Sequence, residues 1–369
     1  MFPAERKLSD VLNEREEQNL LRKLSLVNKK IDFTSNDYLG FARSPELYQL
    51  IEKKASVRNK RVGSGGSRLL SGNSEEAEAL ETFLAKFHNA LSAMLFNSGY
   101  DANIGLFSSI AKKDDTFLYD ELVHASIHDG IRLSKADSFP FRHNDLDHLE
   151  ERLKKSKGII FVAIESVYSM DGDCAPLKEI SDLCKKYGAN LIVDEAHATG
   201  VFGRGLVQNL KLEKDIFARV HTFGKALGCH GAVVLGSDIL RSYLINYARS
   251  FIYTTALPLH SLISIECAYE LLDKSESIQH KLHSTISNFR DRINGTGHWL
   301  DSISSIQSLI VPVNSEVRML CEKIREKDID VRPILSPTVP KGKERIRVCL
   351  HSYNTKEEID LLFNTLETI

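Results

Sequence analysis

The sequence lacks any hydrophobic run of the roughly 18 residues that a membrane-spanning helix needs. Its first stretch, MFPAERKLSDVLNEREEQNLL, is rich in charge and does not contain the apolar segment of a signal peptide. A basic excess is also missing, because 48 Lys and Arg stand against 50 Asp and Glu, a formal net charge of −2. We therefore expect neither a membrane nor a nucleic acid as partner.

Paired cysteines and nucleotide-binding turns are missing as well. The six cysteines are scattered and form no C-x-x-C pair, so we expect reduced thiols in a cytoplasmic protein, with no disulfide and no metal site. The glycine-rich stretch 63–72 lacks the G-K-[ST] ending of a P-loop, and no strand is followed by a G-x-G-x-x-G turn. The absence of both glycine-rich motifs argues against a plain nucleotide-binding α/β enzyme.

Length and composition predict a globular chain of two domains with an added arm. The 369 residues are 42% hydrophobic and 27% charged, the mix of an ordinary globular protein. We expect an N-terminal helical arm (1–40), a large α/β domain with a mainly parallel sheet (41–265) and a small C-terminal α+β domain (266–369). Short apolar runs mark the expected strands of the large domain, which are 93–96, 116–119, 158–164, 190–193, 218–222 and 232–235.

Helices are predicted from apolar spacing and from capping residues. Residues 5–24 carry apolar side chains at helical spacing and are expected to form an amphipathic helix that lies against another surface. Ser44, followed by Pro45, and Ser74, followed by two acidic residues, each mark the start of a further helix. The remaining expected elements are helices 177–187, 262–273, 277–294, 315–327 and one from 355, and strands 308–313 and 345–350.

Two strand ends carry the residue types that a pyridoxal phosphate (PLP) enzyme needs. An apolar strand leads to Asp194, with His197 three residues further on, and another leads to Lys225, which small residues flank. Ligands of open α/β sheets bind at the carboxyl ends of the strands. An acid keeps the pyridine nitrogen of PLP protonated, and a lysine holds the cofactor as a Schiff base. Taken alone, the segment with Asp194 and His197 also fits two residues that cap a loop, and the segment with Lys225 also fits an ordinary solvated lysine.

Two further turns are weaker signals. Ser98, Gly99 and Tyr100 follow a strand and open a helical stretch, where free backbone N–H groups form an anion site that suits a phosphate. His124 lies at the start of another helix. A lone histidine in that position is more often structural, whereas in a PLP site its imidazole stacks on the pyridine ring.

Together these segments resemble one family, the α-oxoamine synthases, which are PLP enzymes of fold type I, the aspartate-aminotransferase-like α/β fold. The resemblance covers nearly the whole chain and implies a homodimer with shared active sites. The matching segments are IDFTSNDYLGFARSPEL, GSGGSRLLSGN, FNSGYDANIG, DELVHAS, FRHNDLDHLE, ESVYSMDGDCAPL, LIVDEAHATGVFGRG, HTFGKALGCHGAV, FIYTTALP and SPTVPKGKERIRVCL.

The resemblance implies a role for each residue of the cofactor site. Lys225 would hold PLP, and Asp194 would pair with the pyridinium nitrogen. His197 and Ser169 would lie at the phenolic oxygen, and His124 would stack on the ring. The groups implied at the phosphate are the backbone of Gly99 and Tyr100, the side chain of Thr222, and Thr254 or Thr255 from the second subunit.

The resemblance also implies the reaction. L-Alanine would condense with an acyl-CoA or acyl carrier protein to give an aminoketone, CO2 and a free thiol, with Lys225 as the base that removes the α-proton. Asn36 would lie near the substrate, Arg347 would bind the amino-acid carboxylate in bidentate fashion, and Arg22, on the first helix, would meet a distal carboxylate of the acyl chain.

Other substrates and other classes are the alternatives. Relatives join glycine with acetyl-CoA or succinyl-CoA, or serine with palmitoyl-CoA. Leu335 stands where some members have an arginine, and Arg332 lies three residues earlier, so the acyl chain is left open. A non-catalytic PLP-fold regulator is disfavoured because all four chemical groups of the site are present and no DNA-binding module is visible.

Overall fold

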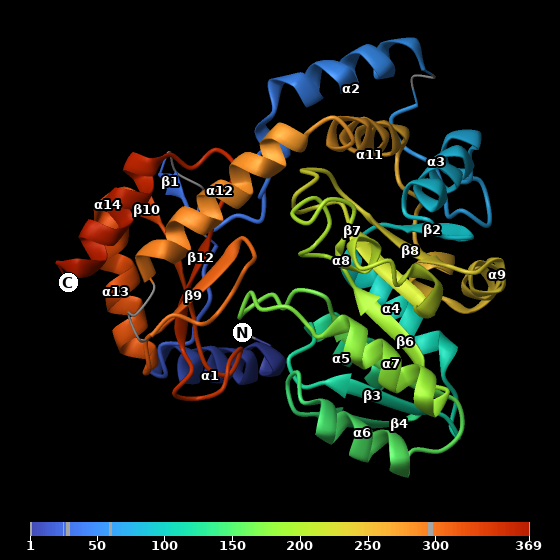
Figure 1. Ribbon diagram of the computed structural model, residues 1–369, viewed down its shortest axis with the longest axis horizontal. Coiled ribbons are helices and arrows are strands. Elements are labelled where there is room, and N and C mark those ends of the chain that lie inside the picture. The colour runs from blue at the N-terminus through green and yellow to red at the C-terminus, as the bar shows by residue number, and fades with distance from the viewer. Residues whose placement is uncertain (1, 25, 27–29, 59–60, 294–297, 369) are drawn as a thin grey trace.

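A computed structural model describes residues 2–24, 26, 30–58, 61–293 and 298–368 of the protein. Figure 1 shows a larger part built around a seven-stranded sheet and a smaller part built around a three-stranded sheet. Below α2 at the top of the view, α11 (Leu259–Leu272) lies on the larger part, and α12 (Glu276–Ile293) runs from it across to the smaller part. The predicted α/β fold class is therefore confirmed.

The large sheet is mixed but mainly parallel. Its order is β2-β8-β7-β6-β5-β3-β4, and only β8 runs antiparallel to its neighbours β2 and β7. Most of its strands were expected because they are apolar on consecutive positions, as in strands that helices cover on both faces. The strands are β2 (Ser92–Phe96), β3 (Thr116–Asp120), β4 (Asp137–Phe141), β5 (Ile160–Glu165), β6 (Asn190–Asp194), β7 (Ala218–Thr222) and β8 (Ala232–Gly236).

One strand of this sheet was missed in the sequence. The first four residues of β4 are exposed, and the segment DSFPF contains a proline. β4 is the edge strand next to β3, and edge strands tolerate exposed side chains and proline because one side of the backbone has no partner strand. The apolar run that identifies a central strand is therefore absent from β4.

Helices surround the large sheet, and their starts follow the predicted caps. The Ser44 and Ser74 side chains accept hydrogen bonds from the backbone N–H groups of Leu47 and Ala77, each at 3.2 Å. The helices of this part are α2 (Pro45–Val57), α3 (Glu75–Phe87), α4 (Gly99–Ile110), α5 (Ala125–Leu133), α6 (Leu146–Lys155), α7 (Leu177–Tyr187), α8 (Leu206–Asn209), α9 (Asp238–Tyr247) and α10 (Arg249–Ile252), with short 3-10 turns η1 (Phe41–Arg43) and η2 (Glu213–Asp215).

The small part combines C-terminal elements with a strand from near the N-terminus. β1 (Ile31–Asp32) pairs in parallel with β10 (Ile329–Asp330). The predicted domain boundary at residue 40 therefore comes after β1, a strand of the small part. The predicted boundary at residue 265 falls inside α11. Both boundaries stay predictions. The other elements are β9 (Ile306–Ile310), β11 (Arg332–Ile334) and β12 (Arg345–Cys349), which form an antiparallel sheet, and helices α13 (Asn314–Glu326) and α14 (Lys356–Glu367).

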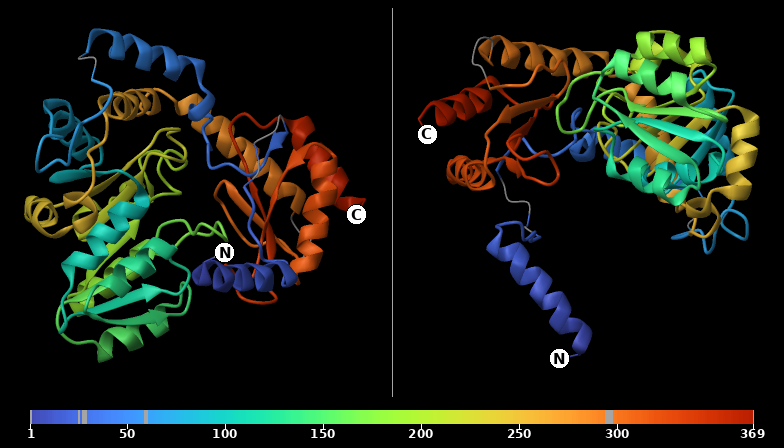
Figure 2. Two further views of the ribbon diagram at one scale, coloured as in Figure 1. Left: turned by 180° about the vertical axis from the view of Figure 1, so that it is seen from behind. Right: turned by 90° about the horizontal axis from the view of Figure 1, so that it is seen from below.

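The first helix differs from its prediction in length and in packing. α1 (Pro3–Glu17) ends well before residue 24, because Asn19 adopts a left-handed backbone conformation (φ 55°). The N–H groups of Asn19 and Leu20 bond back to the carbonyls of Glu16 and Arg15, which is the Schellman way of closing a helix. α1 projects away from the body and buries none of its residues within this chain (Figure 2).

A shared hydrophobic core joins the two parts. One buried cluster includes Leu80 of α3, Tyr269 of α11, Phe289 of α12 and Ile346 of β12. A second cluster lies around the large sheet and contains every apolar residue of β5 and β6, such as Val162 and Ile192. Because α11 and α12 contribute to the same core, the small part is held against the large sheet in a defined position.

Candidate active site

Polar side chains gather where the strands of the large sheet end. β6 ends at Asp194, whose register partner on β5 is Glu165. The turn after β7 carries Lys225, α4 begins at Gly99 after β2, and His124 caps α5 after β3. All these strands run in the same direction, so their carboxyl ends lie at one edge of the sheet, which is where open α/β sheets bind ligands.

A chain of hydrogen bonds leads from Lys225 into the protein. Lys225 Nζ lies 2.8 Å from His197 Nε2, and His197 Nδ1 lies 2.8 Å from the hydroxyl of Tyr38. The Tyr38 hydroxyl donates in turn to Asn36 Oδ1 at 3.0 Å. Tyr38 and His197 are both buried, so the lysine is positioned by groups that have little freedom to move.

One assignment of protons satisfies every contact of this chain. Because Tyr38 donates its only proton to Asn36, the His197 Nδ1–H donates to Tyr38 and Nε2 accepts from Lys225. Burial, together with the charges of Lys225 and Arg347, lowers the pKa of His197 well below its usual value, which keeps the ring neutral. Burial also lowers the pKa of Lys225 to about 8 against the opposing pull of Asp194. A larger fraction of Lys225 is therefore the neutral amine, the nucleophilic form, at neutral pH than for an exposed lysine.

Asp194 and His124 are linked through a shared bridge. The side-chain amide of Asn103 donates to Asp194 Oδ2 at 2.9 Å and to Ser126 Oγ at 3.0 Å. Ser126 Oγ lies 2.7 Å from His124 Nδ1, and the N–H of Ala196 donates to Asp194 Oδ1 at 2.9 Å. The carboxylate and the imidazole that the resemblance places around one aromatic ring are thus oriented by the same residues.

Arg347, on β12, enters the site from the small part. Its Nε donates to the carbonyl of Ser169 at 2.7 Å, and its Nη2 donates to Asn36 Oδ1 at 2.9 Å and to the Tyr38 hydroxyl at 3.3 Å. All three acceptors are neutral, and none of the ion pairs of the described residues includes Arg347. A mostly buried guanidinium with neutral partners provides an unmatched positive charge beside Lys225, which suits a carboxylate ligand.

The predicted phosphate cradle lies at the start of α4. Ser98 caps the helix by accepting from the N–H of Asp101 at 3.0 Å. The backbone N–H groups of Gly99 and Tyr100 have no acceptor among the residues that the structure describes. Thr222 lies beside them, since a Cβ at Gly99 would be 3.5 Å from the Thr222 Cβ. Helix-terminal N–H groups next to a hydroxyl form an anion site.

Three predicted residues lie apart from this cluster. Asn97 donates to the Thr254 hydroxyl at 3.0 Å and to the Thr255 carbonyl at 2.9 Å. Both threonines therefore lie next to the residue that precedes Ser98 in their own chain. Their role toward a second subunit stays a prediction. Arg22 is exposed in the stretch after α1; its placement on the first helix was wrong, because α1 ends at Glu17.

The sequence interpretation missed three residues of this site: Tyr38, Asn103 and Glu165. Glu165 closes a fully buried strand, and one of its carboxyl oxygens has no hydrogen-bond partner among the described residues. Burial beside Asp194 raises its pKa. An acid at the end of an apolar strand is the same signal that identified Asp194, and the sequence shows this signal at Glu165 too. Asn103 was also visible as the polar residue on an otherwise apolar stretch of α4, whereas nothing local marks Tyr38.

The donor set fits PLP. A lysine with a lowered pKa suits an aldehyde carbon, Asp194 suits a protonated ring nitrogen, and the α4 terminus suits a phosphate. Both Asp194 oxygens already accept one hydrogen bond and retain a further lone pair. No group of three or more His, Cys, Asp or Glu side chains in the described residues is arranged to hold a metal ion.

An ion cluster around the buried Asp120 supports the loop that carries Ser169. His143 Nδ1 lies 3.0 Å from Asp120 Oδ1 and His143 Nε2 lies 2.8 Å from Asp173 Oδ2. Burial by itself lowers the pKa of His143, but the bonds to the two carboxylates outweigh it and raise the pKa to about 10. His143 is therefore charged at neutral pH and fixes the end of the loop whose Ser169 carbonyl holds Arg347.

We expect His143→Asn to lower the free energy of unfolding by about 3–5 kcal/mol at pH 6, because the fully buried Asp120 then lacks its counter-charge. The folded-state pKa is raised, so the ion pairs stabilise fully below the unfolded value near 6.5 and less as pH rises through about 10. The difference in melting temperature from the wild type should therefore shrink between pH 6 and pH 10. His280→Asn, at an exposed position of α12, is the control, and an equal loss there or a pH-independent difference would contradict the prediction.

Comparisons with known proteins agree with this geometry. The aminotransferase class I and II family model matches residues 28–366. An 8-amino-7-oxononanoate synthase of Emericella nidulans is 47% identical over 98% of this chain and 94% of its own length. The solved structure of the enzyme of that name from Francisella tularensis is 31% identical, with a TM-score of 0.78 over 92% of this chain and 96% of its own. Sphingomonas wittichii serine palmitoyltransferase is 26% identical, with a TM-score of 0.90 over 98% and 96%.

The family model and the identity to these relatives extend over almost the whole chain, including every strand end described above. Among the described residues, no helix combines the length and the apolar character that crossing a membrane requires. The chain therefore belongs to the aminotransferase class I and II family and, within it, to the α-oxoamine synthases, a family of PLP-dependent enzymes.

Proposed function

We propose that this protein is an acyltransferase of the 8-amino-7-oxononanoate synthase type, in biotin biosynthesis. It joins L-alanine to the pimeloyl group of pimeloyl-CoA or of a pimeloyl carrier protein. The products are 8-amino-7-oxononanoate, CO2 and the free thiol, so every atom of the two substrates is accounted for. The name of the relative that is 47% identical supports this substrate pair.

The observation that carries the proposal is Arg347. The guanidinium is charge-unmatched, lies in the same hydrogen-bonded cluster as Tyr38 and Asn36, and acts electrostatically on Lys225. An amino acid is the simplest substrate that brings a carboxylate and an amine to such a pair. The carboxylate binds Arg347 and places the α-carbon near Lys225.

The chain then moves protons around this carbon. PLP supplies an electron sink that stabilises a carbanion at the α-carbon. The amine of Lys225 accepts the α-proton and later returns a proton to the same carbon, and His197 and Tyr38 hold it in place between these steps. With PLP bound, Asp194 would stabilise positive charge on the ring nitrogen. The imidazole of His124 would pack on the ring, and Ser169 and His197 would interact with its phenolic oxygen.

The rivals within the family differ in the amino acid and in the acyl group. Glycine C-acetyltransferase takes glycine and acetyl-CoA, and serine palmitoyltransferase takes serine and palmitoyl-CoA. The high TM-score to a serine palmitoyltransferase reflects the shared backbone, whereas a methyl or hydroxymethyl group is discriminated by a few pocket contacts. One methyl group contributes only about 1–3 kcal/mol to such discrimination, so direct measurement has to decide.

The test is titration of the PLP-loaded protein with L-alanine, glycine and L-serine, followed by visible absorption, and then addition of pimeloyl-CoA, acetyl-CoA or palmitoyl-CoA with mass detection of the product. We expect the strongest response to L-alanine and the mass of 8-amino-7-oxononanoate. Arg347→Gln should raise the KM for L-alanine by about tenfold to a hundredfold, whereas Arg132→Gln, at a position that is 80% exposed, should leave it unchanged. Turnover with glycine or serine in place of alanine would move the function to a rival.

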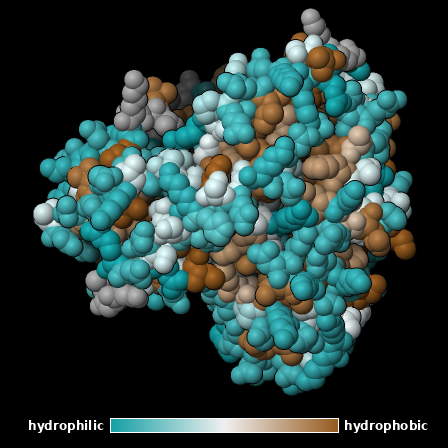
Figure 3. Space-filling model, turned by 45° about the horizontal axis from the view of Figure 1, so that its top comes forward, coloured by the Kyte–Doolittle hydropathy of each residue, from teal (hydrophilic) through white to brown (hydrophobic). Residues whose placement is uncertain are grey.

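A homodimer in the cytoplasm is part of this proposal. Apolar side chains are exposed on α1 and around the connection between α2 and α3, where Val62 is 95% and Leu70 is 85% exposed. The face that includes this region is a mixture of hydrophobic and hydrophilic residues (Figure 3). All six cysteines are free thiols, as a reducing compartment requires.

We expect light scattering to give twice the chain mass of 41.5 kDa for the PLP-loaded protein. Leu70→Ser should shift the equilibrium toward the monomer, because it weakens an apolar contact between subunits. Ile239→Ser, at an 82% exposed position of α9, is the matched control. A monomeric wild type at micromolar concentration would contradict the dimer.

A further inference from the structure

A hairpin next to Arg347 connects the two parts of the molecule. It follows β5 and comprises residues 167–174, with Val167 and Cys174 paired at its base. In Figure 1 it is the green loop that projects from the large part toward the small part. Its tip begins at Ser169, whose carbonyl accepts a hydrogen bond from Arg347 Nε at 2.7 Å. The hairpin therefore contacts the residue that we expect to bind the substrate carboxylate.

The base of this hairpin is held by the large part. Asp173 Oδ2 lies 2.8 Å from His143 Nε2 and accepts from the side-chain amide of Asn144 at 2.8 Å. The Tyr168 ring lies edge-on to the His143 ring, with the ring centroids 4.4 Å apart. The Tyr168 N–H donates to the Asp173 carbonyl across the hairpin at 3.0 Å. These bonds fix the base, and the tip, residues 169–172, extends beyond them.

Two serines of the small part hold the far side of the tip. Ser302 Oγ and Ser304 Oγ each donate to the Gly172 carbonyl at 2.7 Å. Both serines are buried, at 3% and 1% exposure. Gly172 has a left-handed backbone (φ 82°), and a Cβ there would lie 2.2 Å from the carbonyl oxygen of Ile306. Only glycine allows such an approach, so the tip is seated tightly on the stretch that leads into β9.

The strands β9 and β12 hold the near side of the tip. Ser308 on β9 is the register partner of Arg347 on β12, so their side chains lie on the same face of the small sheet. Ser308 Oγ donates to the Met170 carbonyl at 2.7 Å, next to the Ser169 carbonyl that accepts from Arg347. Three of the four carbonyls of residues 169–172 thus accept hydrogen bonds from side chains of the small part.

We infer that Ser302, Ser304 and Ser308 are positioning residues of the amino-acid site, which act on Arg347 through the backbone of the hairpin tip. An arginine binds a carboxylate best when its planar fork is aimed at the two oxygens, and supporting hydrogen bonds provide this aim. A fixed Ser169 carbonyl gives the guanidinium one orientation. The inference rests on the proposed binding of the amino-acid carboxylate by Arg347 and adds the residues that orient this arginine.

The experiment compares two ligands of the PLP-loaded protein, L-alanine and ethylamine, which is alanine without its carboxylate. Their affinities are measured from the change in visible absorption. In Ser302→Ala/Ser304→Ala, which removes both donors to the Gly172 carbonyl, we expect the affinity for L-alanine to fall about tenfold, as a misaimed charge-assisted hydrogen bond implies. The affinity for ethylamine should not change. The KM for L-alanine should rise about tenfold as well, whereas kcat should stay constant.

The single variants and hydrogen exchange test the route through the backbone. Ser302→Ala and Ser304→Ala alone should each have a much smaller effect on the affinity for L-alanine, because the Gly172 carbonyl keeps one donor. The two substitutions should therefore be strongly non-additive. In the PLP-free protein, the peptide that covers residues 167–174 should exchange its amide hydrogens faster in the double variant than in the wild type.

A further variant and a matched control separate this effect from a general loss of structure. Ser308→Ala removes a single bond from the tip, and the ion pair of Arg345 with Asp171 remains. It should lower the affinity for L-alanine and not for ethylamine, and it provides the test if the double variant does not fold. Ser181→Ala is the control, because Ser181 on α7 is equally buried and its hydroxyl has no hydrogen-bond partner among the described residues. It should match the wild type in both affinities.

Equal losses of affinity for L-alanine and ethylamine would show that the serines only stabilise the fold, and would overturn the inference. Unchanged affinity for L-alanine in the double variant, with faster exchange in the hairpin, would overturn it too. A wild type that binds the two ligands equally would refute the role of Arg347 in the proposed function, and the inference with it. If L-alanine binds as expected but no pimeloyl thioester is converted, the positioning role stands and the proposed function fails.

Discussion

Replacing Lys225 with alanine is expected to abolish turnover, by a factor on the order of 10⁴ or more, without lowering the melting temperature. The amine is the group within 2.8 Å of His197 that accepts and returns the substrate proton, and no other side chain of the cluster can take its place. Burial and the charge of Arg347 lower the pKa of His197, which makes its ring a weak base, and Tyr38 donates its proton to Asn36.

The stability part of this prediction follows from the direction of the pKa shift. Burial lowers the pKa of Lys225 in the folded protein to about 8, below its usual value of 10.5. The unfolded chain therefore binds a proton more readily than the folded one at neutral pH, and the lysine destabilises the fold there. This penalty diminishes as pH rises through about 8 toward 10.5. Removing the side chain should leave the melting temperature equal or higher.

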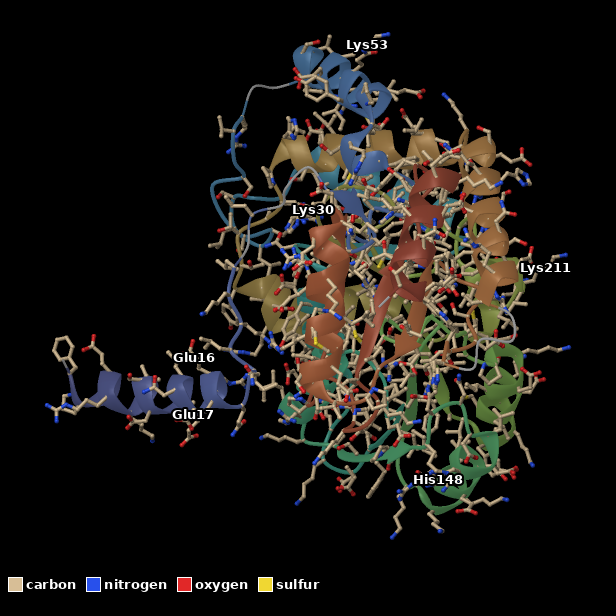
Figure 4. The ribbon with its side chains drawn as sticks, turned by 90° about the vertical axis from the view of Figure 1, so that its left-hand side faces the viewer. Glu16, Glu17, Lys30, Lys53, His148 and Lys211 are labelled. Carbon is tan, nitrogen blue, oxygen red and sulfur yellow. The ribbon has the colours of Figure 1, made fainter. Side chains whose placement is uncertain are left out.

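The measurements are the rate of product formation, the visible absorption of the PLP-loaded protein and its thermal unfolding. Lys225→Ala should lose the lysine-dependent absorption band, and Lys225→Arg, which keeps the charge but not the nucleophile, should lose it too. Lys53→Ala, at an exposed position of α2 (Figure 4), should behave as wild type. Residual turnover within a hundredfold of wild type, or an unchanged absorption band in Lys225→Ala, would refute the assignment.

The central residues could be predicted from the sequence because each follows directly from the end of a strand. Asp194 and the turn that leads to Lys225 both follow apolar strands, and parallel strands bring such residues to one edge of a sheet. The helix start at Ser98 was visible for the same reason, as a capping residue after a strand. Local sequence, together with the rule that ligands bind at the carboxyl ends of parallel strands, was sufficient to predict these residues of the site.

The other half depends on contacts between distant segments. Arg347 and Asn36 are 311 residues apart in sequence and hydrogen-bonded in space, and Tyr38 and His197 are 159 apart. No local pattern specifies these pairs, because they arise only when the small part packs onto the large sheet. The resemblance to a family named Asn36 and Arg347, but Tyr38, which joins them to His197, required the structure.

Elements at the periphery were predicted least well. The sequence from Gln18 to Leu24 continues the apolar spacing of the first helix, and only the left-handed conformation of Asn19 ends it. β4 lacks an apolar run because it lies at an edge. In both places the deciding factor is exposure to solvent, which weakens the hydrophobic pattern on which helix and strand prediction depends.

Asp194 and Glu165 are register partners, yet we expect their amide variants to behave in opposite ways. Asp194→Asn should lower kcat/KM on the order of 10²- to 10³-fold, because an amide does not keep the ring nitrogen of PLP protonated. Glu165→Gln should stay within about threefold of wild type at pH 7, because burial beside Asp194 raises the pKa of Glu165 and the neutral amide resembles the protonated acid. The backbone N–H groups of His124 and Ser169 that bond the carboxyl group can bond the amide oxygen instead.

The pair also differs in its dependence on pH. In the wild type, Glu165 ionises as pH rises through its raised pKa and adds a negative charge next to Asp194 and Lys225. That charge destabilises the fold and favours protonated Lys225, so Glu165→Gln should keep its rate and its melting temperature to higher pH than the wild type does. Equal losses of rate in the two variants at pH 7 would mean that Glu165 is ionised in the working enzyme. The two carboxylates would then share the stabilisation of the cofactor ring, and Asp194 would not carry it alone.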